Sequence, residues 1–128
     1  MRVKQHILVV DDEPPIRELL ESYFHKHGYD VTTAPDAADA LNKANNLLLH
    51  LVILDVLLPD SDGLEVLEKL KSAHPSLPII VMTGMGFDEE LLQESIQKGA
   101  TGYVSKSLPL DQLLMEVHRT LKYKAARS

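Results

Sequence analysis

Three aspartates stand directly after short apolar stretches, at two places far apart in the sequence. Asp11 and Asp12 follow the stretch ILVV, and Asp55 follows LVIL. Carboxylates that meet within a few ångströms repel one another unless a cation lies between them. Oxygen ligands without His or Cys suit a hard cation, and Mg²⁺ fits best because it takes one or two carboxylates and keeps several waters. The three aspartates are therefore expected to bind Mg²⁺.

Two side chains suited to phosphate follow later apolar stretches. Thr83 follows IIVM, and Lys106 follows YVS. A hydroxyl and an ammonium donate hydrogen bonds to phosphoryl oxygens, and a bound divalent cation offsets the repulsion between acids and phosphate. Aspartate is a nucleophile that forms acyl phosphates, and Asp55 follows the middle one of five apolar stretches. We therefore predict phosphoryl transfer to Asp55, with Thr83 and Lys106 binding the transferred group.

The elements that must position these residues are five short apolar segments, separated by stretches of helical periodicity. The predicted strands are His6–Val10, Tyr29–Thr33, Leu51–Leu54, Pro78–Met82 and Gly102–Val104. Strands that are apolar on both faces belong in a parallel sheet covered by helices on each side. The sequence therefore predicts a doubly wound α/β fold of five β-α units. Ligands bind such sheets at the carboxyl ends of the strands, where all five residues are expected to meet.

Apolar side chains between these segments recur at the spacing of one helix face. The predicted faces are Ile16, Leu19, Leu20, Tyr23 and Phe24; Ala37, Ala40, Leu41 and Ala44; Leu64, Leu67 and Leu70; and Leu110, Leu113, Leu114, Val117 and Leu121. The residues typical of helix starts are Pro14, Pro15, Asp36 and Asp88, and those typical of helix ends are Gly28 and Gly99. The periodicity and the end signals agree on alternating strands and helices.

One predicted helix, Asp88–Lys98, has a thin apolar face. It carries Leu91, Leu92 and Ile96 on an otherwise polar surface. An element that buries little apolar surface changes position at modest energetic cost. This helix is therefore the candidate for a moving part, although an ordinary surface helix would have the same pattern.

Length and composition narrow the function classes. The chain has 128 residues, which suits one domain over 1–128, with a core of about 6–122 and a tail or linker start at 123–128. The net charge of -6 argues against a nucleic-acid surface, and cysteine is absent, which excludes disulfides. No apolar run approaches the ~20 residues that span a bilayer. We expect a cytoplasmic protein without nucleic-acid or membrane partners.

Four stretches together resemble the CheY-like receiver domain of two-component response regulators. They are ILVVDDEPPIRELL, LVILDVLLPDSDGLEVL, PIIVMTGMG and GATGYVSKS, and the resemblance covers about His6 to Leu121. The most specific part is Asp55 followed by Pro59 and Gly63. The resemblance implies a flavodoxin-like fold with a five-stranded parallel sheet of order 2-1-3-4-5 and helices on both faces.

The resemblance also implies roles for residues. A sensor histidine kinase or phosphotransfer protein would pass a phosphoryl group to Asp55 in a Mg²⁺-dependent reaction. Asp12, Asp55 and the backbone carbonyl of Leu57 would ligate Mg²⁺ directly, and Asp11 would act mostly through water. Thr83 and Lys106 would bind the phosphoryl group. The residues of the implied switch are Thr83 and Tyr103.

The partners implied by the resemblance lie on both sides of the signalling step. The phosphorylated domain would control a downstream protein or a missing effector domain. It could also pair with a second copy through the face made by the Asp88–Lys98 helix, the strand Gly102–Val104 and the C-terminal helix. The domain would not be an enzyme beyond its own phosphorylation and dephosphorylation.

The sequence departs from the family pattern directly after Lys106. Ser107 stands where proline usually follows the lysine. A cis bond before a non-proline residue costs ~2.5–4 kcal/mol, so we predict a trans Lys106–Ser107 bond.

Leu57 and Met85 lie two residues past Asp55 and Thr83, and their side chains cannot hydrogen-bond an attacking water. This predicts slow hydrolysis of a phosphoaspartate. Glu13 is expected to be a bystander near a helix start.

Three alternative functions remain at the level of sequence. A degenerate receiver could act only as a protein-interaction scaffold. A Mg²⁺-dependent aspartyl phosphohydrolase would need a general acid two residues past its nucleophile, where Leu57 offers none. A flavodoxin-like cofactor binder would need a phosphate loop rich in Gly, Ser or Thr after the first strand, and that loop is acidic here.

Overall fold

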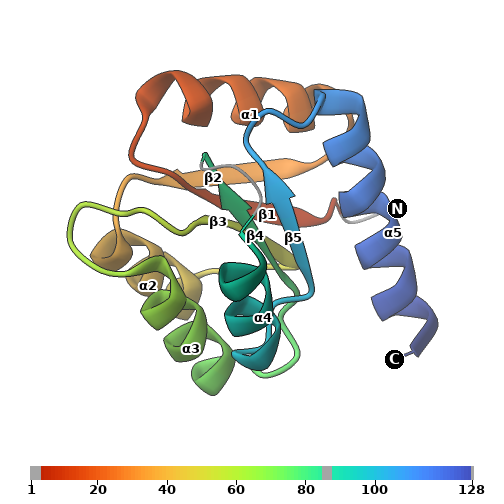
Figure 1. The fold of residues 1–128 in the computed structure, drawn as a ribbon. Helices are drawn as coiled ribbons and strands as arrows, with labels where there is room; N and C mark the ends of the chain where they lie inside the picture. The colour runs from red at the N-terminus through yellow and green to blue at the C-terminus, as the bar shows by residue number, and fades with distance from the viewer. Residues whose placement is uncertain (1–3, 85–87, 128) are drawn as a thin grey trace.

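Strands and helices alternate along the chain, as predicted. The computed structural model describes residues 4–84 and 88–127. Its elements are β1 His6–Val10, α1 Pro14–Lys26, β2 Asp30–Ala34, α2 Ala37–Asn46, β3 Leu51–Asp55, α3 Gly63–Ala73, β4 Ile79–Thr83, α4 Glu89–Gln97, β5 Gly102–Ser105 and α5 Leu110–Arg127 (Figure 1). Four strands differ from the predicted limits by one residue: β2 and β4 at both ends, and β3 and β5 at the C-terminal end. No helix in the described part of the chain is long and apolar enough to cross a membrane.

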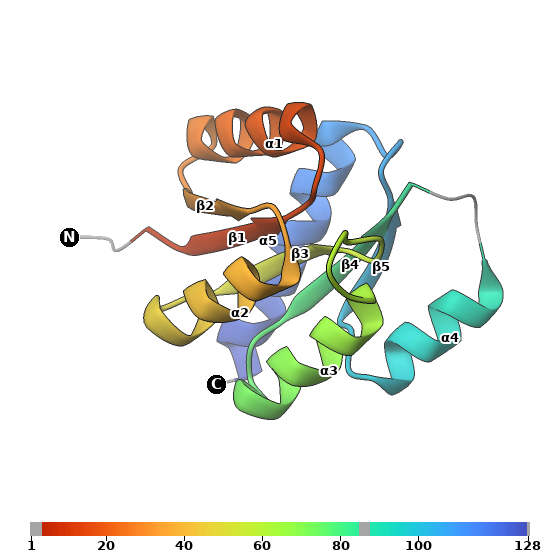
Figure 2. The ribbon, with the colours of Figure 1, turned by 90° about the vertical axis from the view of Figure 1, so that its left-hand side faces the viewer.

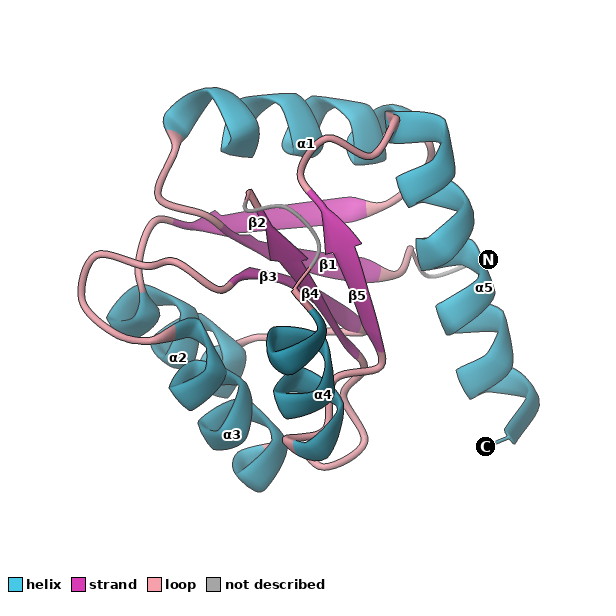
Figure 3. Ribbon diagram, viewed as in Figure 1, coloured by secondary structure: helices cyan, strands magenta, loops and turns pink. Residues whose placement is uncertain are grey.

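The five strands form one parallel sheet of order β2-β1-β3-β4-β5. This confirms the predicted order. The central strand β3 is buried along its whole length, and its Ile53 pairs with Val9 on one side and Ile80 on the other. Parallel strands need crossover connections, and these place a helix against the sheet between each strand and the next, while α5 follows the last strand (Figure 3).

Helices cover both faces of the sheet, which explains why the strands are apolar on both faces. Alternate residues of a strand point to opposite faces. Leu8 and Val10 accordingly pack with buried residues of α2 and α3, whereas Ile7 and Val9 pack with those of α1 and α5. Figure 2 shows α1 and α5 on one side of the sheet and α2, α3 and α4 on the other. The predicted three-layer architecture is confirmed.

The predicted helix ends are also confirmed. Pro14 and Pro15 open α1. Gly28 follows the end of α1 at φ 95°. At the start of α2, the Asp36 carboxylate accepts a hydrogen bond from the Asp39 amide at 2.8 Å. Asp88 caps α4 in the same way as Asp36 caps α2, and Gly99 follows α4 at φ 104°. Glycine adopts this left-handed conformation without the penalty that a Cβ brings.

Two residues of the predicted helix faces do not face the core. Leu19 of α1 is 48% exposed, and Ile96 of α4 is 55% exposed. In α4 the buried position is Ser95, which lies one turn after the partly buried Leu91. Residues four apart share a helix face, whereas Ile96 lies about 100° further round the axis. The thin buried face predicted for α4 is therefore confirmed, but Ile96 is not part of it.

Candidate acidic site at the carboxyl edge of the sheet

The three aspartates singled out in the sequence meet at one edge of the sheet. Asp55 ends β3, and Asp11 directly follows β1, which pairs with β3 through Val10 and Leu54. Asp11, Asp12 and Asp55 each offer a carboxylate oxygen, and these atoms lie within 4.8 Å of one another. Asp11 and Asp55 are buried, whereas Asp12 is exposed. The parallel register of β1 and β3 brings the two strand ends together.

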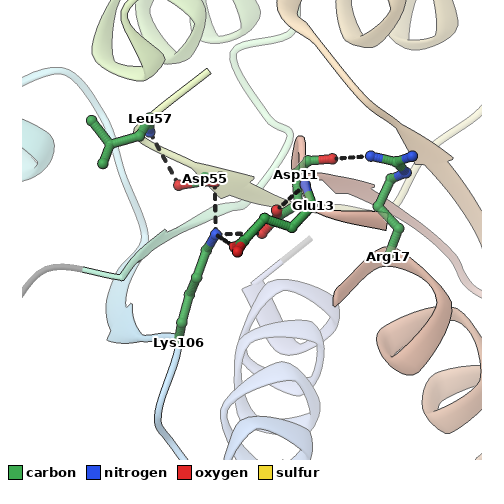
Figure 4. Close-up of polar contacts among 6 residues, drawn as sticks. All are labelled: Asp11, Glu13, Arg17, Asp55, Leu57 and Lys106. Carbon is green, nitrogen blue, oxygen red and sulfur yellow. Dashed lines mark hydrogen bonds and ion pairs between the residues drawn. The ribbon is translucent and has the colours of Figure 1, made fainter. Parts of the chain in front are cut away.

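Lys106 reaches this cluster from the end of β5. Its Nζ atom lies 3.0 Å from Asp11 Oδ2 and 2.9 Å from Asp55 Oδ2 (Figure 4). The backbone amide of Lys106 donates to the Thr83 carbonyl at 2.7 Å, which continues the pairing of β4 and β5 past the end of β5. The lysine side chain is only 15% exposed. The structure therefore gathers Asp11, Asp12, Asp55 and Lys106, as the sequence predicted.

A pair of serine hydroxyls shapes the loop that carries Lys106. Ser105 Oγ accepts a hydrogen bond from the Ser107 amide at 3.1 Å and lies 2.8 Å from Ser107 Oγ. The Leu108 amide donates to the Ser105 carbonyl at 3.0 Å, which closes a turn around Lys106. The Lys106–Ser107 bond is trans, as predicted, and no cis bond occurs in the described residues. Ser107 therefore does not prevent Lys106 from reaching the acids.

Glu13 is not the bystander that the sequence suggested. Lys106 donates a hydrogen bond to Glu13 Oε2 at 2.6 Å, across 93 positions of sequence. The backbone amide of Glu13 also donates to Asp11 Oδ1 at 2.9 Å, and Arg17 donates to the Asp11 carbonyl at 2.7 Å. The prediction was wrong because it considered only the helix start, whereas the distance to Lys106 depends on how β5 packs beside β4.

Burial and charge act in opposite directions on the two central groups. Burial raises the pKa of Asp11 above its usual 3.8, and the nearby Asp55 charge raises it further. The hydrogen bond from the Glu13 amide and the contact with Lys106 lower this pKa, but they do not outweigh burial. Burial alone would lower the pKa of Lys106, but its close contacts with the carboxylates of Glu13, Asp55 and Asp11 raise it well above its usual value. The lysine is therefore fully charged at neutral pH and offsets part of the carboxylate repulsion.

The donor atoms fit a hard divalent cation. Asp11 Oδ2 and Asp55 Oδ2 are buried, and within the described residues the one ammonium of Lys106, at 3.0 and 2.9 Å, is the only cation in contact with either of them. Buried carboxylate oxygens are normally satisfied by donors or by a metal. Three carboxylates with only oxygen donors match the ligand set of Mg²⁺ or Ca²⁺ rather than that of Zn²⁺.

The β3–α3 loop, residues 56–62, holds Asp55 from the other side. The Leu57 amide donates to Asp55 Oδ1 at 3.1 Å, and Leu57 forms an isolated bridge with Asp62. The Gly63 amide donates to the Val56 carbonyl at 2.9 Å. A Cβ on Gly63 would lie 2.3 Å from Val56 Cα, so only glycine lets the start of α3 approach this closely.

Asp60, which the sequence reasoning did not single out, joins this loop to α2. Its carboxylate accepts hydrogen bonds from the Ala37 amide at 2.8 Å and the Ala38 amide at 3.1 Å. The Ala37 bond is the main reason that the pKa of Asp60 lies below its usual 3.8. With Asp36 bonded to the Asp39 amide, two acids satisfy three amides of the first turn. Asp60 therefore ties the loop after Asp55 to a neighbouring helix.

Thr83 and Tyr103 occupy different parts of this end of the molecule. Thr83 ends β4, is buried, and follows Met82, which pairs with Asp55. Tyr103 is a half-buried residue of β5 that packs against the α2–α4 side of the core, and its hydroxyl oxygen is buried. Burial and the charge of Asp88, the N-cap residue of α4, raise the pKa of Tyr103 above its usual value. Residues 85–87, which include Met85, lie outside the described residues.

Comparisons with known proteins agree on one family. Residues 7–118 match the model of the response regulator receiver domain. The probable transcriptional regulatory protein TcrX of Mycobacterium tuberculosis is 34% identical over 91% of this chain and 49% of its own length. This chain therefore spans about half the length of that relative. Sporulation initiation phosphotransferase F of Bacillus subtilis is 32% identical over 96% of this chain and 98% of its own length.

A solved structure shares the whole fold. The CheY-like response regulator receiver domain protein of Methanospirillum hungatei superimposes with a TM-score of 0.93 at 29% identity. The match covers 98% of this chain and 100% of that one. The strand order and the five helices described above are thus those of a CheY-like domain.

Proposed function

Since the chain belongs to the receiver domains of response regulators, we propose that Asp55 accepts a phosphoryl group from a phosphohistidine of a sensor histidine kinase or phosphotransfer protein. The observation that carries this proposal is the environment of Asp55. The residue ends the central strand, is 1% exposed, and has Lys106 Nζ 2.9 Å from Oδ2. A nucleophile needs such a fixed position beside a cation that offsets the charge gained during transfer.

The proposed transfer requires one bond to form and one to break. An Asp55 carboxylate oxygen bonds to phosphorus while the phosphorus–nitrogen bond of the phosphohistidine breaks. The electron pair of that bond stays on the imidazole nitrogen, which takes up a proton from water. The Leu57 amide and Lys106 hold the two Asp55 oxygens in separate contacts, so the carboxylate has a defined orientation before attack.

Asp11, Asp12, Asp55 and the backbone carbonyl of Leu57 are the proposed Mg²⁺ ligands, with Asp11 acting mostly through water. Bound Mg²⁺ would neutralise charge on the phosphoryl oxygens. The buried Oδ2 atoms of Asp11 and Asp55, two anionic oxygens that share the single charge of Lys106, support this assignment, as does the restriction to oxygen donors. Lys106 would then bind one phosphoryl oxygen by its ammonium, and Thr83 another by its hydroxyl.

We further propose that phosphorylation changes the face made by α4, β5 and α5. A phosphoryl group adds nearly two negative charges and three acceptor oxygens. If Thr83 moves toward it, the space beside Tyr103 changes, and Tyr103 already lies near Asp88 at the start of α4. Since α4 buries little besides Ser95, it can shift at low cost. The changed face would bind a downstream protein, an effector domain or a second copy of the chain.

The test is phosphorylation by acetyl phosphate with Mg²⁺, followed by the mass of the intact protein. We expect a gain of one phosphoryl group that is lost in Asp55→Asn. Continuous release of phosphate with no lasting gain would instead indicate an aspartyl phosphohydrolase. Absence of any gain in the folded wild-type protein would refute the proposal and leave the scaffold function.

A further inference from the structure

Glu13 has a place in the acidic site that the proposed chemistry does not use. An ammonium has three N–H donors. Three carboxylate oxygens surround Lys106 Nζ: Glu13 Oε2 at 2.6 Å, Asp55 Oδ2 at 2.9 Å and Asp11 Oδ2 at 3.0 Å. An oxygen of an incoming phosphoryl group can reach this ammonium only if one carboxylate gives way.

The three carboxylates differ in how easily they can leave. The side chains of Asp11 and Asp55 are 0% and 1% exposed, whereas that of Glu13 is 56% exposed. A buried carboxylate that loses its cation stays desolvated, but an exposed one regains water. Glu13 is therefore the partner that can be displaced at the lowest cost.

The backbone of Glu13 does not need to move for this exchange. Its amide is bonded to Asp11 Oδ1 at 2.9 Å, and its carbonyl accepts from the Ile16 and Arg17 amides at 3.1 Å each. The Glu13 side chain makes no capping hydrogen bond to the start of α1. Its carboxylate can thus turn away from Lys106 by side-chain rotation alone, while the loop and the helix start stay in place.

We propose that Glu13 is a positioning residue that occupies Lys106 in the unphosphorylated protein and competes with the phosphoryl group for it. This inference rests on the proposed function. Before transfer, the Glu13 carboxylate holds the ammonium beside Asp55 and Asp11. During transfer the Glu13 carboxylate gives up one N–H donor of Lys106 to a phosphoryl oxygen, and the Glu13 side chain rotates into the solvent. The competition weakens binding of any phosphoryl-like anion to the site, and so limits phosphorylation in the absence of a partner that supplies binding energy.

Neutralising Glu13 should therefore strengthen the binding of phosphoryl-like anions. Glu13→Gln retains the size of the side chain but exchanges a charged acceptor for a weak neutral one. Losing one exposed ion pair changes a dissociation constant by only a small factor. We therefore expect the dissociation constant of beryllofluoride, a mimic of the phosphoryl group, to fall by about fivefold. The rate constant of phosphorylation by acetyl phosphate should rise by a similar factor. A residue that merely supported the loop or the metal site would change both quantities in the opposite direction.

The experiment measures beryllofluoride binding by ¹⁹F NMR at saturating Mg²⁺, with phosphorylation rates measured alongside. The matched control is Glu18→Gln, which removes the same charge from an exposed position of α1. A second variant, Glu13→Asp, keeps the charge but shortens the side chain and should lose much of the contact with Lys106. We expect tighter binding in both Glu13 variants and an unchanged constant in Glu18→Gln.

Two kinds of result overturn the inference and leave the proposed function intact. One is that the wild-type protein binds beryllofluoride and Glu13→Gln binds it no more tightly. The other is a gain in Glu13→Gln that Glu18→Gln reproduces or that Glu13→Asp lacks, because charge alone would then explain it. A folded wild-type protein that neither binds beryllofluoride nor gains a phosphoryl group would instead refute the proposed function itself.

Discussion

Gly63→Ala should damage both the stability of the fold and the reaction at Asp55. The added Cβ would lie 2.3 Å from Val56 Cα and 2.7 Å from the Asp55 carbonyl oxygen, both of them backbone atoms. Ordinary contacts begin at 3.4 Å, so the start of α3 and the chain at Asp55 and Val56 must separate by about 1 Å. No flexible side chain can absorb this change, because the atoms in contact belong to the backbone.

The size of the effect follows from the contacts that the separation disturbs. Overpacking of this kind costs about 1–3 kcal/mol. The Gly63–Val56 hydrogen bond of 2.9 Å contributes about 1 kcal/mol more if it is lost. We expect the free energy of unfolding to fall by about 2–4 kcal/mol, a large part of the roughly 5–15 kcal/mol of a typical domain. Since displacements of about 1 Å reduce rates by up to about a hundredfold, phosphorylation of Asp55 should slow strongly in the folded variant.

The assay is urea unfolding followed by circular dichroism, with acetyl phosphate kinetics measured where the variant is folded. The matched control is Gly102→Ala, whose Cβ would meet Ile80 Cγ1 at an ordinary 3.5 Å. We expect this control to stay within about 1 kcal/mol of the wild type. A Gly63→Ala variant as stable as Gly102→Ala, with an unchanged phosphorylation rate, would refute the reasoning about the close approach.

Three further predictions concern the metal, pH and the lifetime of the phosphorylated state. Mg²⁺ at about 100 times its dissociation constant should stabilise the fold by about 2.7 kcal/mol and raise its melting temperature. The Asp12→Asn variant should lose most of this rise. A wild-type melting temperature that Mg²⁺ leaves unchanged at constant ionic strength would contradict the metal site. Hydrogen bonds from the first amides of α2 lower the pKa of Asp60 below 3.8, so its stabilising contribution is present above pH 3.8 and lost as pH falls through the lowered value. Urea midpoints measured from pH 7 to pH 3 should therefore change less in Asp60→Ala than in Glu21→Ala, and equal slopes would count against the cap. Leu57 offers an attacking water no side-chain partner, so ³²P-labelled Asp55 should decay slowly, and a half-life of seconds would show this reasoning to be wrong.

The sequence determined the architecture because its signals are local. Runs of residues that are apolar on both faces, such as Leu51–Leu54, can be satisfied only inside a parallel sheet covered on each side. Caps such as Asp36 and glycines such as Gly28 act within a few residues, so they marked the helix ends correctly. Once the strands were assigned, their carboxyl ends alone predicted that Asp11, Asp12, Asp55 and Lys106 lie together, as they do in the structure.

Periodicity was less reliable for the outer parts of helix faces. Leu19 and Ile96 fit the apolar spacing of their helices, yet each is about half exposed. Spacing shows which residues share a face, but the width of the buried strip depends on how deeply the helix packs against the sheet. In α4, which packs lightly, that strip narrows to Leu91 and Ser95.

Only the tertiary structure decided which partners the loop residues around the acidic site contact. Glu13 and Lys106 are 93 positions apart, and Asp60 caps a helix that begins 23 positions earlier. Such contacts depend on side-chain reach across loops, and a shift of one or two ångströms makes or breaks a hydrogen bond. The sequence therefore predicted the acids and the lysine as a set, because strand register brings them together. That Lys106 is already held by three carboxylates, one of them exposed and displaceable, follows from packing alone.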